Sequence, residues 1–211
     1  MNKRRLLATT ALLATPLAAQ ALEPAHVDGY YQPWTNFEVD VPHADDADVD
    51  GDGWGAKAFV PLGQPQNFVI TGEYETTSYD DDFDVDEFRV GGGYQMQLGQ
   101  TDALTGGLFA EYVSYDLDGE DADGYGVHLR LHGKAAERVA LYGSVGYVNL
   151  SGDHDLDFDG FEYLLGASVD VTPQFGLFAE FRESKLEGDN DLDLTADEVR
   201  TGVRFVFDTH G

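Results

Sequence analysis

The feature that most constrains this chain is an alternation of side chains that repeats from residue 27 to its end. Apolar or aromatic residues stand at every second position of each stretch, and connectors separate the stretches. A period of two residues indicates β-strands, because successive side chains of a strand point to opposite faces. The alternation predicts ten strands, at residues 27–40, 53–61, 67–79, 84–97, 103–117, 122–134, 138–151, 158–172, 175–187 and 196–208.

The connectors between these strands are of two alternating kinds. Four are short and contain few acids, at residues 61–66, 98–102, 133–138 and 172–174. The other five contain most of the 40 acidic residues, at residues 40–52, 78–87, 116–123, 151–162 and 187–198. One short, plain end and one end of long acidic loops, with an even number of strands, is typical of a transmembrane antiparallel up-and-down β-barrel. Eight strands is the alternative count, because one expected strand contains Pro33 and another boundary rests on residues 172–173.

The two faces of the predicted strands differ in chemistry. Arg or Lys facing lipid at mid-depth costs about 2–4 kcal/mol, so basic residues should lie opposite the aromatic face. They do, except for Lys185 beside an acidic connector. The expected lipid-facing set includes Trp54, Phe68, Tyr94, Leu108, Leu129, Leu165 and Phe205. A soluble barrel with this apolar face turned inward is the alternative.

The opposite face is expected to line a narrow lumen that side chains fill. Its charges are nearly balanced, which predicts networks of ion pairs, with His128 and His132 nearby. Such a network could be a structural polar core or the lining of a narrow, gated pore. The candidate residues are Lys57, Glu73, Arg89, Glu111, Arg130, Glu180, Arg182, Arg200 and Arg204, and Glu75, Glu87 and Glu162 are expected on the same face.

The pattern of the two faces reverses near the acidic end. In residues 80–96, DDDFDVDEFRVGGGYQM, the positions in phase with Phe88 and Val90 become Asp86 and Asp84, while Val85 and Phe83 take the other face. A strand that leaves hydrocarbon for water should turn acids outward and apolar residues inward. We therefore expect an extension beyond the membrane, built around Phe83, Val85, Tyr115, Leu117, Leu150, Leu156, Phe158, Leu186, Leu192 and Leu194. Packing would explain this core, and a pocket for a small apolar ligand is the alternative.

Two acidic segments resemble the first half of a calcium-binding loop. Asp46, Asp48 and Asp50 precede Gly51, and a similar run ends at Gly160. Oxygen ligands at alternate positions suit Ca²⁺ or Mg²⁺, but both segments lack the closing Glu. Asp46, Asp48 and Asp50 are the candidate metal ligands. No other cofactor is expected.

Catalysis has one weak candidate, Asp153-His154-Asp155, in which a histidine between carboxylates could activate water. A second acidic pair, as in the omptin outer-membrane proteases, cannot be matched. We expect no enzymatic activity. The net charge of −28 also argues against nucleic-acid binding.

The N-terminus predicts export. Met1 to Arg5 is basic, an apolar run follows, and Ala19-Gln20-Ala21 has the small-x-small form of a cleavage site. We expect residues 1–21 to be a signal peptide and residues 22–211 the barrel. Without cysteine, the exported chain forms no disulfides.

Segments such as GDGWGAKAFV, DEFRVGGGYQ and ERVALYGSVGYVNL resemble strands of small bacterial outer-membrane β-barrels, the superfamily that includes the OmpA membrane domain and OmpX. The resemblance covers residues 27–207 and implies an outer-membrane location, with lipid, lipopolysaccharide and the barrel-assembly machinery as partners. Phe205 and Phe207 fit its terminal assembly signal, although four residues follow. The expected role is structural or surface-interacting, and a narrow porin-like channel for small cationic or apolar solutes is the alternative.

Overall fold

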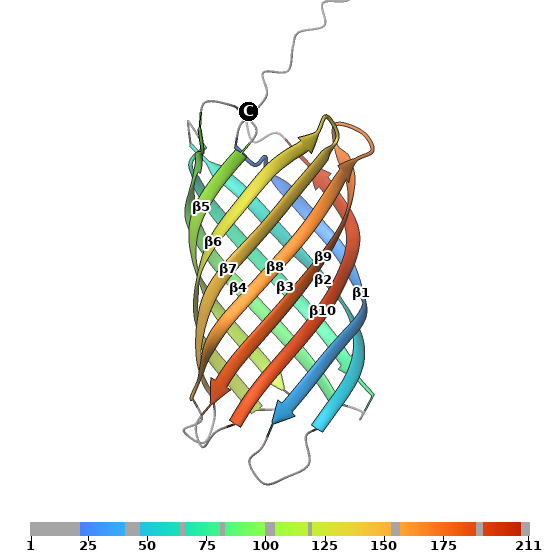
Figure 1. Ribbon diagram of the computed structural model, residues 1–211, viewed down its shortest axis with the longest axis vertical. Coiled ribbons are helices and arrows are strands. Elements are labelled where there is room, and N and C mark those ends of the chain that lie inside the picture. The colour runs from blue at the N-terminus through green and yellow to red at the C-terminus, as the bar shows by residue number, and fades with distance from the viewer. Residues whose placement is uncertain are drawn as a thin grey trace, which may run out of the picture.

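The computed structural model describes residues 22–40, 47–63, 66–80, 83–99, 104–117, 120–152, 157–188 and 192–207. Ten strands close into one barrel (Figure 1). Within these ranges no helix is long and apolar enough to cross a membrane. The strands are β1 (His26–Asp40), β2 (Ala47–Leu62), β3 (Phe68–Tyr79), β4 (Phe83–Gln97), β5 (Leu104–Leu117), β6 (Glu120–Ala136), β7 (Val139–Gly152), β8 (Asp157–Asp170), β9 (Phe175–Gly188) and β10 (Leu192–Val206).

Each strand pairs antiparallel with the next, and β1 pairs with β10 to close the wall. The predicted fold class and the count of ten are confirmed, and the alternative of eight is wrong. Pro33 is accommodated inside β1, where the register on both neighbours is irregular just after Tyr31 or Gln32. Proline has no N–H to give to a ladder, so an irregularity is where a strand tolerates it. Residues 171–174 separate β8 from β9.

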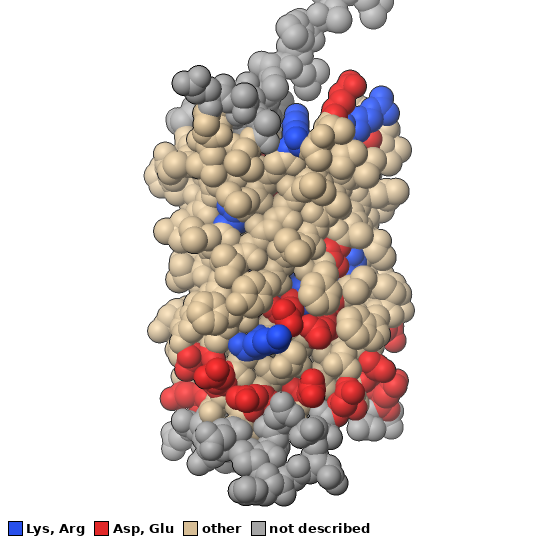
Figure 2. Space-filling view, viewed as in Figure 1, with Lys and Arg blue, Asp and Glu red and all other residues tan. Residues whose placement is uncertain are grey.

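The acidic connectors are shorter than the sequence predicts. The strand expected to begin at residue 53 begins at Ala47, and the one expected at 196 begins at Leu192. The prediction of long acidic loops is corrected in this respect, because many of those acids lie on strands. These acids alternate with apolar residues. The strands can therefore continue beyond the membrane, where water replaces hydrocarbon on the outer face of the sheet. Acids gather at the end of the barrel away from the start of β1 (Figure 2).

A wide band of the outer wall shows few charged side chains (Figure 2). Large hydrophobic side chains stand exposed on it, including Leu165 at 69%, Phe68 at 65% and Tyr125 at 61%. The alternative of a soluble barrel with this face inward is therefore wrong. Near the acidic end the interior changes: Val113, Val148 and Leu150 form a buried apolar cluster, with Tyr115, Phe158 and Leu186 packed against it. Phe37, Tyr79 and Phe83 pack together in the same extension.

Candidate functional site: the lumen charge network

Three arginines form the centre of the lumen. Arg89 on β4, Arg182 on β9 and Arg200 on β10 stand on the inward face of their strands and are almost completely buried. A buried guanidinium has to be matched by carboxylates, because the cost of removing it from water is several kcal/mol. The facing strands supply those carboxylates, and we call the resulting group the lumen charge network.

Arg200 is shared by four carboxylates. Its Nη1 lies 3.0 Å from Glu73 Oε1 and 3.6 Å from Glu180 Oε1. Its Nη2 lies 2.5 Å from Glu75 Oε2 and 2.6 Å from Glu198 Oε2. Lys57 Nζ adds a second cation 2.5 Å from Glu180 Oε1. These contacts join β2, β3, β9 and β10 across the interior.

Arg89 and Arg182 form the adjoining half of the network. Arg89 Nη1 lies 2.7 Å from Glu111 Oε1, and its Nη2 lies 2.7 Å from Glu162 Oε2. Arg182 Nη2 lies 2.8 Å from the same Glu162 oxygen and 2.9 Å from Glu87 Oε1. The guanidinium groups thus bridge β4, β5, β8 and β9, and these wall positions are tied together through the centre.

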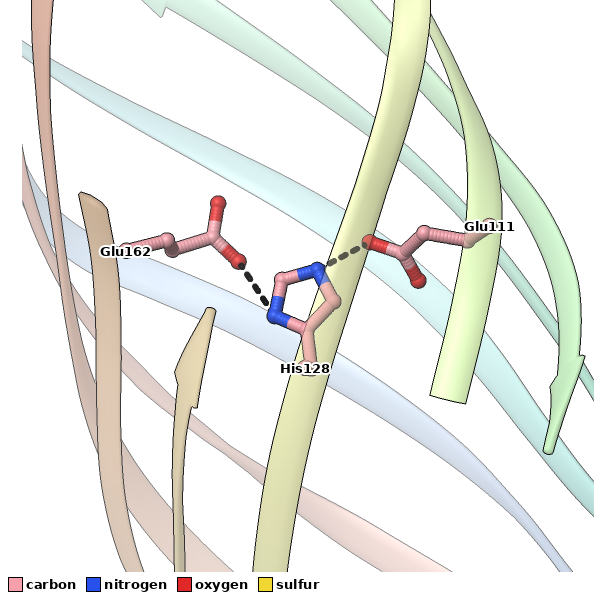
Figure 3. Close-up of side chains that lie close together, drawn as sticks. All are labelled: Glu111, His128 and Glu162. Atoms are coloured by element: carbon pink, nitrogen blue, oxygen red, sulfur yellow. Dashed lines mark ion pairs between the residues drawn. The ribbon is translucent and has the colours of Figure 1, made fainter. Parts of the chain in front are cut away.

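His128 lies between two of these carboxylates (Figure 3). Its Nε2 is 2.9 Å from Glu111 Oε1, and its Nδ1 is 4.0 Å from Glu162 Oε1. Three such groups could hold a metal ion by distance. However, Arg89 already neutralises both carboxylates, so a cation would have to displace it. Among the described residues the other group that meets the distance criterion is Glu75, Glu87 and Glu198, and arginines occupy it in the same way.

A separate set of pairs fills the lumen near the start of β1. Arg204 donates two hydrogen bonds to Asp28, at 2.8 and 2.7 Å. Arg130 Nη2 lies 2.7 Å from Glu23 Oε1, and Glu23 also exchanges backbone hydrogen bonds with the Gln95 side chain. The candidates Arg130 and Arg204 are therefore placed in a layer of their own, apart from the Arg200 cluster.

Three lumen acids were not expected from the sequence: Glu23, Asp28 and Glu198. Glu198 stands two positions before Arg200, so the alternation itself could have found it. Asp28 belongs to a strand whose faces were left unassigned. With these residues the described carboxylates of the lumen outnumber its lysine and arginine side chains. The expected near balance of charge in the lumen is therefore wrong. Tyrosine hydroxyls donate to carboxylates as well: Tyr30 to Glu73 and Glu75, and Tyr142 to Glu180.

A small cavity of about 110 Å³ lies within the lumen charge network, among Lys57, Glu73, Arg89, His128 and Arg200. That volume holds a few water molecules. Beyond it stands the apolar cluster around Leu150, so ion pairs and then apolar packing occupy successive levels of the interior.

A ring of tyrosine–aspartate hydrogen bonds marks the outer wall where the apolar band meets the acids. In each pair the tyrosine hydroxyl of one strand donates to the aspartate of the next strand. The bond measures 2.9 Å from Tyr31 to Asp52, 3.2 Å from Tyr74 to Asp86 and 2.6 Å from Tyr112 to Asp123. Tyr147 donates to Asp159 in the same way. We call this ring the tyrosine–aspartate girdle.

Two of the proposed metal ligands, Asp48 and Asp50, lie beyond the girdle toward the acidic end. Asp48 and Asp50 are exposed on one face of β2, so they belong to a strand, and the loop expected there is corrected. Asn36 donates to both, and Trp34 Nε1 lies 3.2 Å from Asp50 Oδ1. Asp46 lies outside the described residues, as do residues 153–155, the catalytic candidate, and residues 1–21, the expected signal peptide. Lys185, which departs from the lumen pattern, is exposed and pairs with Glu183 at 2.7 Å.

Comparison with known proteins identifies the sequence family. The family described as "Outer membrane protein beta-barrel domain" matches residues 6–207. A comparison with curated protein sequences finds no significant match.

Solved structures share the fold at low sequence identity. The β domain of the Bordetella autotransporter BrkA is 12% identical with a TM-score of 0.54, covering 86% of this chain and 99% of that one. An outer membrane channel from Pseudomonas putida F1 is 10% identical with a TM-score of 0.53, covering 91% and 99%. The outer membrane protease OmpT from Escherichia coli is 11% identical with a TM-score of 0.51, covering 88% and 97%. At such identities the likeness is one of fold alone.

Proposed function

The chain belongs to the outer membrane protein β-barrel family, and from that premise we propose that it is a closed, non-enzymatic barrel of the bacterial outer membrane. Its working surface is the acidic rim above the tyrosine–aspartate girdle, and its role is structural or surface-interacting. The proposal includes export through a signal peptide at residues 1–21 and insertion by the barrel-assembly machinery.

The observation that carries the proposal is the filling of the lumen. Arg89, Arg182 and Arg200 hold carboxylates from β3, β4, β5, β8, β9 and β10, and the cavity among these side chains is about 110 Å³. A solute that passed through would have to separate buried ion pairs, and breaking one such pair costs about 3–5 kcal/mol. This cost supports a closed barrel over a porin-like channel.

Conductance across a planar lipid bilayer tests the closed state. We expect the refolded barrel to give no stable current steps. Insertion is checked in the same preparation by protection of the barrel from added protease. A reproducible, cation-selective current from inserted protein would replace the proposal with the channel function.

The acidic rim supports a role for divalent cations. Acids on the outer face would repel the phosphate groups of neighbouring lipopolysaccharide, whereas Mg²⁺ or Ca²⁺ between them would join the two surfaces. Oxygen ligands are what both ions prefer. We therefore assign to the rim, with Asp46, Asp48 and Asp50 among its acids, the binding of cation-bridged lipopolysaccharide.

Thermal unfolding in liposomes with and without lipopolysaccharide tests the rim. Millimolar Mg²⁺ should raise the melting temperature of the wild type only when lipopolysaccharide is present. Changing the rim acids Asp48, Asp50 and Asp157 together to Asn should reduce that rise, while Asp170→Asn, at the opposite end of β8, should leave it intact. An equal Mg²⁺ effect in all three proteins would remove lipopolysaccharide bridging from the proposal.

The proposal contains no catalytic step. Two histidines lie between described carboxylates, and both are buried in the lumen. His26 Nε2 lies 3.8 Å from Glu23 and 3.9 Å from Asp28, which Arg130 and Arg204 already engage. His128 lies between Glu111 and Glu162, and Arg89 engages both of these carboxylates. A peptide substrate could reach either histidine only by displacing these ion pairs. This geometry supports an electrostatic role for His128 within the closed lumen.

A further inference from the structure

The outer wall carries an apolar groove over β4 to β8, in the half of the barrel nearest the short turns. Its volume is about 1100 Å³, and leucine side chains supply much of its lining, among them Leu108, Leu131, Leu141 and Leu165. The same leucines belong to the exposed apolar band. The groove therefore opens toward the hydrocarbon of the membrane.

Glycines create this hollow. Gly106 on β5, Gly133 on β6 and Gly143 on β7 all line it. In the strand register Leu131 pairs with Gly106 on one side and with Gly143 on the other, and Gly133 stands between Leu104 and Leu141. Rows that alternate glycine with leucine across neighbouring strands produce a floor of backbone between raised side chains. The floor is wide enough for a flexible hydrocarbon chain to lie in it.

Basic residues stand at the end of the groove that faces the short turns. Lys134 has the lumen phase on β6, but it is exposed where the strand ends and also lines the groove, and Arg138 is exposed in the turn at residues 137–138. Lys185 is also exposed, but it lies near the acidic end and pairs with Glu183. Two exposed acids lie near this end as well: Glu137 stands between Lys134 and Arg138, and the Asp170 backbone N–H donates to the Arg138 carbonyl. In a chain of net charge −28, these two cations mark a place suited to an anion.

We propose that this groove is a binding site for one anionic phospholipid of the periplasmic leaflet. One acyl chain lies over Gly133 and Gly143, beside the Leu98 side chain that covers Gly106, and the phosphate contacts Lys134 and Arg138. Apolar contact holds the acyl chain, because the side chains that line the groove would otherwise lack packing partners on their outer side. The two cations favour a headgroup with net negative charge, because basic residues near a membrane surface attract anionic lipids.

Native mass spectrometry of the full mature barrel tests the site. The protein is released from nanodiscs that contain phosphatidylglycerol and phosphatidylcholine with identical acyl chains. We expect one retained lipid per barrel, with phosphatidylglycerol preferred. Changing Lys134 and Arg138 together to Gln should reduce that preference about tenfold, and Lys185→Gln is the matched control that should not.

Filling the groove tests the acyl-chain half of the proposal. A Cβ at Gly106 would meet the flexible end of Leu98 at 2.7 Å, so a leucine at this position would push the Leu98 side chain into the groove. Gly106→Leu should reduce retention of both lipids severalfold. Ala179→Leu is the control: it puts a leucine at an exposed position of β9, outside the groove, and should leave the retention of both lipids unchanged.

Equal retention of both lipids by the wild type, or retention untouched by both groove variants, would overturn the proposal. So would dimers that Gly106→Leu dissolves, because the groove would then belong to a second copy of the chain. If Gly106→Leu does not refold, the variant of Lys134 and Arg138 still tests the proposal. These two residues lie at a strand end and in its turn, so their substitution should leave the barrel able to refold.

Discussion

The waist of the barrel and its acidic extension are built from the same strands with opposite rules. On β8, Tyr163 and Phe161 face outward with 43% and 52% of their surfaces exposed, and Glu162 between them is buried in the lumen. A few residues earlier Asp157 is outside, and Phe158 packs against the inner cluster. The backbone is continuous and only the surrounding solvent differs. The face of a strand on which its apolar side chains stand therefore indicates where the hydrocarbon of the membrane ends.

The tyrosine–aspartate girdle lies at that transition. Each of its tyrosines has a ring in the apolar band and a hydroxyl that reaches an acid of the extension. Tyrosine suits this place because one end of the side chain is apolar and the other forms hydrogen bonds. The following changes test whether the two regions obey separate rules.

The largest effect is expected in the lumen of the waist. Arg200→Met removes the cation shared by Glu73, Glu75 and Glu198 and leaves buried carboxylates without a partner. We expect a loss of about 4 kcal/mol in the free energy of unfolding, measured by urea titration in liposomes. A loss below about 1 kcal/mol would mean that water reaches these carboxylates freely.

A charge placed on the outer wall should destabilise the waist of the barrel more than the acidic extension. Leu165→Arg puts a guanidinium at the middle of the apolar band and should cost about 3 kcal/mol. Asp157→Arg places the same side chain on the same face of β8 in the extension and should cost little. Urea titrations of both variants check the difference, and similar costs would contradict a change of solvent along the strand.

The inner core of the extension should respond as a protein core does. Leu150 is 3% exposed and packs with Val113 and Val148. Leu150→Ala should cost about 2 kcal/mol through lost burial and the cavity left behind. Leu129→Ala, on the lipid face, should cost less because lipid fills the space. Unfolding free energies in the same liposomes measure both, and equal losses would place Leu150 outside a packed core.

The girdle should give the smallest effect. Tyr147→Phe removes the hydrogen bond to Asp159 and should cost about 0.5 kcal/mol, since the bond is exposed to water. A double-mutant cycle with Asp159→Asn isolates this coupling. A coupling energy indistinguishable from zero would show that the pair marks the boundary without stabilising it.

Alternation predicted the ten strands, the closed barrel and the two faces of the wall, because a side chain's phase on a strand decides which solvent it meets. The lumen positions of Arg89, Arg182 and Arg200 follow from the same phase. Their partners do not: Lys57 meets Glu180, which is 123 residues away in the sequence. Such contacts depend on barrel closure and register, which alternation leaves open.

The tyrosine–aspartate girdle could not be predicted from the sequence, for a related reason. Tyr112 reaches Asp123 only because β5 and β6 pair with Ser114 opposite Asp123, and hairpin length sets that register. Composition also misled the prediction of the connectors. Acids at residues 47–52 were assigned to a loop because charge is common in loops, although their alternation with apolar residues already fits a strand in water.

Accessibility along the outer face of β8 tests the central claim most directly. The chain has no cysteine, so spin labels can be placed one at a time at positions 165, 163, 161, 159 and 157 in the reconstituted protein. We predict that labels at 165, 163 and 161 collide mainly with dissolved oxygen, whereas labels at 159 and 157 collide mainly with a water-soluble nickel chelate. Nickel access at position 165, or oxygen-dominated access at position 157, would contradict the account.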